Sequence, residues 1–208
     1  MTAVRLRADA YAATFRPDAG MLGTSLRWRG DEYIARPEPL IRNRRGAMTA
    51  LALMHPWANR LGGRRYRAAG RTVSLAGLDL ATDDVGLPLH GNLGAARFTV
   101  ESAEATRVVA SRLHERGDER FPAFPFPHRL TVEARLDAHR GLTVRTTVEP
   151  TGSRPVPVAF GWHPYLRLPE SGRARWRLDL PRCQRLGLDH RNLPTGERTP
   201  VQIGRAHV

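Results

Sequence analysis

The chain has 208 residues, of which 41% are hydrophobic and one is cysteine. We therefore expect one globular domain without an internal disulfide or a cysteine-rich metal site. The basic residues are 33 arginines and no lysine, and together with 20 acidic residues they give a net charge of +13. The absence of lysine is typical of a GC-rich coding sequence and excludes lysine Schiff-base chemistry. We predict no dedicated nucleic-acid binding.

Membrane insertion and export are not predicted. No apolar run reaches the length of about eighteen residues that a membrane-spanning helix needs. The N-terminal residues lack the apolar block of a signal peptide. We therefore expect a cytoplasmic protein that does not contact membranes.

Short strands separated by turns are predicted along the whole chain. In 129–136 and 142–149, apolar and polar residues alternate with a period of two, as in half-buried antiparallel strands. The other predicted strands are 11–15, 24–28, 32–35, the apolar run that starts at Leu51, a hairpin over 64–75, 98–100, 106–113, 175–180 and 185–188. No convincing amphipathic helix or repeat interrupts them, so the fold class is all-β, a sandwich or barrel.

The eight histidines are the main candidates for chemistry. No pair has the spacing of a common metal site, so we predict no metal centre. His90 and His163 each end an apolar strand, beside Gly91 and Pro164, and are expected to be held rigidly at a sheet edge facing a cleft. A second group is interpreted as lying on loops or faces without a special role: His55, His114, His128 and His139.

Three short motifs carry a resemblance to a known family. They are Pro56–Arg60 (PWANR), Leu89–Gly91 (LHG) and Gly161–Tyr165 (GWHPY). Their order and spacing resemble the three successive signatures of the aldose 1-epimerases, which are galactose mutarotase-like proteins. The resemblance extends from about residue 10 to residue 201. It implies a large antiparallel β-sandwich (the galactose mutarotase-like supersandwich), a small free aldohexose such as glucose or galactose as substrate, and no cofactor.

The resemblance also implies a mechanism and the residues that perform it. Aldose 1-epimerases interconvert the α and β anomers of a sugar by opening its ring. A base takes the proton of the C1 hydroxyl while an acid protonates the ring oxygen, a task that suits histidine. By resemblance, His163 is the acid, His90 assists it, and Arg60 with Asn59 holds sugar hydroxyls.

One expected part of the family pattern is not found. In the family, a glutamate that acts as general base follows a turn that resembles Pro194–Glu197, and Glu197 itself belongs to that turn. Residues 202–208 read as translated sequencing-adapter DNA. We therefore expect residues 1–201 to be a mutarotase-like domain that is incomplete at its C-terminus, with 202–208 as a non-native tail, and we expect this fragment to be inactive.

Three alternatives remain at this stage. An epimerase of hexose 6-phosphates would use arginines near the cleft, such as Arg42, Arg44 or Arg45. A non-catalytic carbohydrate-binding protein would use Trp57, Trp162 and Arg60 without proton transfer. A third alternative is nonspecific polyanion binding through arginine.

Overall fold

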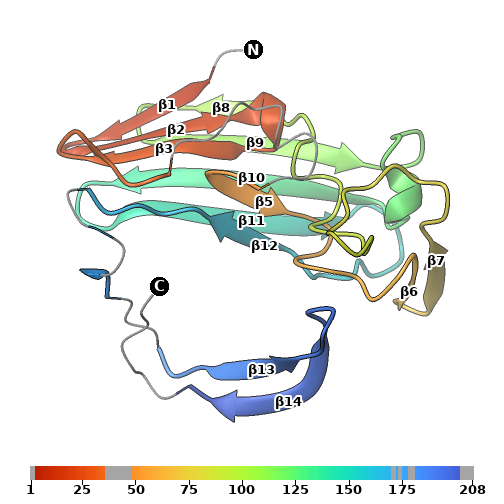
Figure 1. Ribbon diagram of the computed structural model, residues 1–208. Coiled ribbons are helices and arrows are strands. Elements are labelled where there is room, and N and C mark those ends of the chain that lie inside the picture. Colours follow the sequence, from red (N-terminus) through yellow and green to blue (C-terminus); the bar gives the residue numbers. More distant parts are fainter. Residues whose placement is uncertain (1–2, 36–47, 170–171, 173–174, 178–180, 202–208) are drawn as a thin grey trace. The chain divides into compact units, whose positions relative to one another are not determined.

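The computed structural model describes residues 3–35, 48–169, 172, 175–177 and 181–201, and these residues form an all-β fold (Figure 1). All strand pairs within the sheets are antiparallel. The predicted fold class is confirmed. Within the described residues, no helix is long and apolar enough to cross a membrane.

The chain divides into two compact units, residues 1–167 and 168–208. The described part of the second unit contains one antiparallel hairpin, formed by β13 (Gln184–Leu188) and β14 (Pro194–Pro200). All other strands and the candidate site belong to the first unit.

Two sheets and a separate hairpin form the first unit. The six-stranded sheet has the order β1-β2-β3-β5-β12, with β4 paired to β3. Its strands are β1 (Val4–Ala8), β2 (Tyr11–Arg16), β3 (Leu22–Trp28), β4 (Asp31–Glu32), β5 (Leu51–Met54) and β12 (Gly161–Pro164). The four-stranded sheet has the order β11-β10-β9-β8. Its strands are β8 (Thr99–Ala103), β9 (Arg107–His114), β10 (His128–Asp137) and β11 (Gly141–Pro150). The hairpin consists of β6 (Arg65–Ala68) and β7 (Arg71–Ser74), and the 3-10 turns are η1 (Pro17–Ala19) and η2 (Phe121–Ala123).

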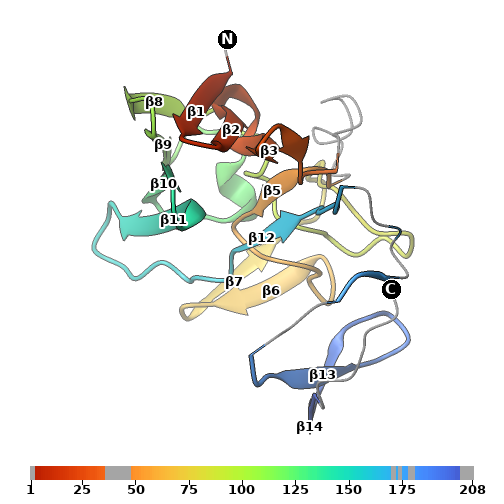
Figure 2. The same cartoon turned by 90° about the vertical axis from the view of Figure 1, so that its left-hand side faces the viewer.

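The two sheets are held together by one shared apolar core. Figure 2 shows them as two layers, with β8 to β11 on one side and β1, β2, β3, β5 and β12 on the other. Alternate residues of β10, from Leu130 to Leu136, point inward and are buried. They pack with Leu6, Phe15 and Leu53 of the opposite sheet. Because burial of apolar surface is the main stabilising term, this inward row explains why the period-two pattern predicted the sheet.

Four local features differ from the prediction. The strand expected at 32–35 is the two-residue β4, and Ile34 forms only an isolated bridge. Val4–Ala8 forms the edge strand β1, which was not predicted. Only Leu6 in this strand is fully buried. The segment interpreted as the turn Pro194–Glu197 opens strand β14. Residues 175–177 are not in a strand, and 178–180 lie outside the described residues. The predicted non-native tail, 202–208, also lies outside them and stays a prediction.

Candidate active site

The three predicted motifs meet at one edge of the six-stranded sheet. Strand β12 pairs with β5 so that His163 lies opposite Ala52. The chain that follows β5 then makes bridges to the Leu89–Gly91 loop, His55 with Gly91 and Arg60 with Leu89. This pairing brings together segments that are about 30 to 110 residues apart in the sequence.

Two candidate site residues have unusual backbone conformations. Asn59 has φ 58° and His90 has φ 60°, both in the left-handed region. The two are linked, because the His90 N–H donates to the Asn59 carbonyl at 2.8 Å. Asparagine and histidine are among the residues that tolerate this region best, and such conformations concentrate at functional sites. The surrounding structure therefore holds Asn59 and His90 in these backbone conformations.

The predicted catalytic histidines lie together. The ring centroids of His90 and His163 are 5.7 Å apart, and the ring planes are nearly perpendicular at 84°. Tyr165 stacks on the His163 ring, with centroids 4.6 Å apart and an angle of 14°. Among the described residues, Nδ1 of both histidines is buried without a hydrogen-bond partner. Burial first, and then the proximity of His163 and Arg60, lowers the pKa of His90 below its ordinary value, so His90 is neutral at pH 7.

Arg60 is held beside the pair by two side chains. Its Nε donates to Asp83 Oδ2 at 2.6 Å, and its Nη1 donates to Asn59 Oδ1 at 2.8 Å. The Asp83 carboxylate also accepts the backbone N–H groups of Val85 and Leu87. Burial raises the pKa of Asp83, but the bonds from Arg60 and the amides outweigh it, and the pKa is lower than usual. The sequence analysis missed Asp83, because no local signal connects it to an arginine 23 residues earlier.

The two tryptophans of the motifs pack in apolar clusters, and the Trp57 indole nitrogen is buried without a partner among the described residues. Trp57 is 5% exposed and packs into a second apolar cluster with Val73, Leu75 and Phe124. Trp162 packs against the core between the sheets and donates its Nε1–H to Thr146 Oγ1 at 3.0 Å. A stacking role for either ring on a sugar therefore loses support, because each ring already packs in an apolar cluster.

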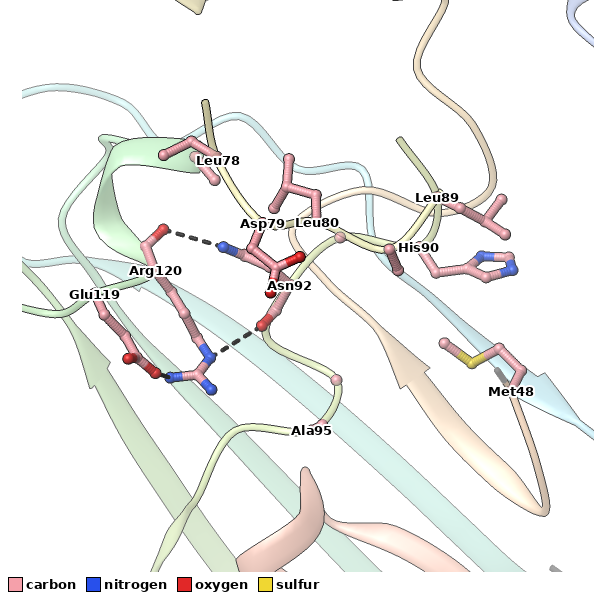
Figure 3. Close-up of a pocket in the computed structure, with 14 residues that line it drawn as sticks. Met48, Leu78, Asp79, Leu80, Leu89, His90, Asn92, Ala95, Glu119 and Arg120 are labelled. Carbon is pink, nitrogen blue, oxygen red and sulfur yellow. Dashed lines mark hydrogen bonds and ion pairs between the residues drawn. The ribbon is translucent and has the colours of Figure 1, made fainter. Parts of the chain in front are cut away.

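A cavity of about 350 Å³ lies against the loop that carries His90. Figure 3 shows His90 and Met48 toward one end and Asn92, Glu119 and Arg120 toward the other. The Asn92 side chain donates to the Arg120 carbonyl, and Arg120 Nε donates to the Asn92 carbonyl, both at 3.2 Å. Neither His163 nor Arg60 is among the described residues that line the cavity. The cavity therefore adjoins the histidine pair without enclosing it.

Three histidines that were interpreted as lying on loops or faces are in the core. His55 is 1% exposed, and His114 and His128 are 0% exposed. The interpretation was wrong for these three, because their rings find hydrogen-bond partners inside the protein. His128 has the same strand parity as Leu130 and Val132, a signal that could have predicted its burial. His139 is exposed, as expected.

The arginines proposed for a phosphorylated substrate, Arg42, Arg44 and Arg45, lie outside the described residues. The phosphate hypothesis therefore stays a prediction from sequence.

Comparison with known proteins agrees with the resemblance. A sequence model of the aldose 1-epimerase family matches residues 24–205. The chain is 25% identical over 142 residues to the uncharacterised protein YihR of Escherichia coli K12. A galactose mutarotase-like protein from Clostridium acetobutylicum superimposes with a TM-score of 0.79 at 20% identity over 94% of this chain. A putative aldose 1-epimerase from Escherichia coli K12 superimposes with a TM-score of 0.72 at 19% identity over 97% of this chain. These structures confirm the predicted mutarotase-like β-sandwich.

The chain is shorter than the proteins it matches. The aligned part spans 67% of this chain and 43% of the YihR protein. The two solved structures are covered over 60% and 62% of their own lengths.

Proposed function

The chain belongs to the aldose 1-epimerase family, and from this premise we propose that it carries the acid side of an anomerase site for a free aldohexose. The observation that supports this proposal is the pair His90 and His163, 5.7 Å apart beside Arg60. Proton transfer to and from a sugar near neutral pH is a task for imidazole.

The proposed roles follow from the environment of each group. Because Nδ1 of His90 is enclosed without a partner among the described residues, we assign the ring proton of its neutral imidazole to Nε2; an enclosed N–H without an acceptor is the costlier arrangement. His163 acts as the acid in its imidazolium form: its Nε2–H passes to the ring oxygen of the sugar, and a neutral imidazole remains. His90 is neutral and assists at the ring oxygen or the C1 hydroxyl. Because His90 carries no charge, it does not oppose the positive charge of His163 before the transfer.

Arg60 is proposed to bind sugar hydroxyls together with Asn59. Its Nε and Nη1 are engaged by Asp83 and Asn59. No bond from the described residues engages Nη2, which has two N–H groups to donate. Asp83 holds the guanidinium in one orientation, so less conformational freedom is lost when the sugar binds.

The proposed reaction also needs a general base for the C1 hydroxyl. Asp83 lies at the site, but its carboxylate is engaged by Arg60 and two amides, and its lowered pKa makes it a weak base. We propose that the base comes from outside the residues described and that the 208-residue chain by itself is slow or inactive.

Polarimetry with chemical rescue tests this proposal. The decay of fresh α-glucose or α-galactose would be followed with the 208-residue chain, with and without added acetate, after subtraction of the acetate-only rate. We expect little acceleration without acetate and a saturable acceleration with it, because acetate can replace the missing base. His163→Ala should abolish the rescued rate, whereas His139→Ala, a change at an exposed histidine, should leave it unchanged. Sugar binding by NMR without any rescue would favour the non-catalytic carbohydrate-binding alternative.

A further inference from the structure

The core contains three histidines that the proposed chemistry does not use. His55 follows β5, His114 ends β9, and His128 begins β10. Neighbouring rings are close, with centroids 5.0 Å apart for His55 and His128 and 4.9 Å apart for His114 and His128. We call these three residues the histidine network. Polar side chains are rarely buried in this way unless they are hydrogen-bonded.

The hydrogen bonds of the network define where each proton lies. His128 Nδ1 is 2.7 Å from the Phe126 carbonyl, which can only accept, so Nδ1 carries the proton. His128 Nε2 is then an acceptor, and His55 Nε2 donates to it at 2.9 Å. In the same way, His114 Nε2 donates to the Phe124 carbonyl at 2.8 Å. When the rings are neutral, each therefore has one assigned tautomer, and Nδ1 of His55 and of His114 is enclosed without a partner among the described residues.

The surroundings of the network oppose a positive charge. Phe124 packs against all three rings, and Phe160 packs against His55. Among the described residues, the charged groups that act on the network lie beside His114: Arg112 and Arg120 lower its pKa, Asp118 raises it, and burial outweighs Asp118 so that the pKa of His114 is lowered. Burial and the neighbouring histidines lower the pKa of His55 to about 3. Burial lowers the pKa of His128 to about 4, against the opposing effect of the Phe126 carbonyl.

Protonation would remove the central bond of the network. If His128 gained a proton, both of its ring nitrogens would be donors, and its Nε2–H would face the Nε2–H of His55. His55 could respond only by changing its tautomer or by moving its ring. Among the described side chains, no three of the histidines, cysteines and acidic residues are arranged to hold a metal ion.

The backbone of His55 connects the network to the candidate site. The carbonyl of His55 accepts the N–H of Leu93 at 3.0 Å, and His55 forms a bridge with Gly91. A Cβ added to Gly91 would overlap that carbonyl, so the loop rests directly on His55. His90 precedes this contact by one residue. A movement of His55 therefore reaches His90 through tight backbone contacts with Gly91 and Leu93.

We propose that His55 and His128, backed by His114, are positioning residues that hold the His90 loop in place while all three rings are neutral and release it when the network takes up a proton. The catalytic consequence rests on the proposed function. The positioning itself does not rest on the proposed function, because it concerns only the coupling between the histidine network and the His90 loop.

Nuclear magnetic resonance on the ¹⁵N-labelled 208-residue chain tests the coupling without sugar or turnover. At pH 7.5 we expect ring ¹⁵N shifts of neutral tautomers protonated at His128 Nδ1 and His55 Nε2. The measured quantity is the hydrogen-exchange protection factor of the Leu93 amide, compared with that of Val132 in β10. As the pH falls to 4.5, the protection factor of Leu93 should drop about tenfold or more, which corresponds to the loss of about one hydrogen bond. The protection factor of Val132 should fall only at lower pH.

Two variants separate positioning from general stability. His55→Leu removes the donor, so Leu93 should already be poorly protected at pH 7.5. In His55→Gln the amide N–H can donate to neutral His128, and after a flip the amide oxygen can accept from protonated His128. Protection of Leu93 should therefore be restored at pH 7.5 and persist to lower pH. His139→Gln is the matched control and should change nothing. Equal protection of Leu93 in the native chain at pH 7.5 and 4.5, or a charged His55 or His128 ring at pH 7.5, would overturn the proposal even if both variants failed to fold.

Discussion

Two groups of histidines in this protein show how different roles can arise from one side chain. His90 and His163 lie at a sheet edge beside Arg60 and are partly exposed. The histidine network of His55, His114 and His128 lies in the core, and each ring donates to an acceptor inside the protein. An enclosed Nδ1 without a partner among the described residues occurs in both groups, in His90 and His163 and in His55 and His114. Exposure therefore separates the two groups: the network uses its donors to join segments of the fold, whereas the rings at the sheet edge can reach a ligand.

The largest effect is expected at Gly91, where the two groups meet. Gly91→Ala would push a Cβ into the His55 carbonyl at a φ of 71°, which should cost about 3 kcal/mol or more in unfolding free energy. Gly86→Ala is the control, because Gly86 has a similar φ of 83° but open space around it, and should cost only about 1 kcal/mol. Urea unfolding followed by tryptophan fluorescence measures both. Equal costs would show that the loop does not rest on His55.

Acid should destabilise the network before it affects most carboxylates. Unfolded histidines bind a proton near pH 6.5, whereas burial lowers the pKa of folded His128 to about 4 and that of His55 to about 3. The unfolded state therefore binds more protons in this window. Stability is complete above about pH 6.5 and falls as the pH drops towards 4, by roughly 3 kcal/mol for His128 alone. Thermal unfolding at pH 7.5, 6, 5 and 4.5 checks this, and an unchanged midpoint across the series contradicts it.

A smaller effect is expected at the hydrogen bond between Trp162, which precedes His163 in β12, and Thr146. Thr146→Val removes the acceptor of the Trp162 indole N–H, and we expect a loss of about 1 kcal/mol in unfolding free energy. Thr147→Val, an exposed neighbour on the same strand, is the control. Sugar binding should be little changed because Trp162 is structural. A large loss of sugar affinity without a loss of stability would instead favour stacking of Trp162 on the sugar.

The smallest effect is expected at the ion pair between Asp83 and Arg60. Asp83→Asn keeps the size of the side chain but weakens its hold on Arg60, so sugar affinity should fall several-fold with little change in the fold. Asp84→Asn, at an exposed neighbour, should bind sugar like the native chain. Titration of the sugar by NMR measures both. Identical affinities would mean that Arg60 does not depend on Asp83 for its orientation.

Much of the fold could be predicted, but the site only in part. The strands β10 and β11 were predicted because alternating apolar residues show which face is buried, and β2, β5 and the β6–β7 hairpin were also predicted. His90, His163 and Arg60 were selected by their motifs, and the structure brings them together. The pairing of Asp83 with Arg60 was not predictable, because no local rule relates two residues on separate loops.

The sequence by itself determined where the antiparallel strands lie and which three motifs carry the candidate site, because strand periodicity and short motifs are local properties of a chain. Only the tertiary structure decided which histidines face each other and which are enclosed. That decision depends on pairing between β5 and β12, on the contact of Gly91 with His55, and on the carbonyls of Phe124 and Phe126. These partners lie far apart in the sequence, and a histidine becomes a site residue at a sheet edge or a core residue only through the hydrogen bonds and desolvation that they impose.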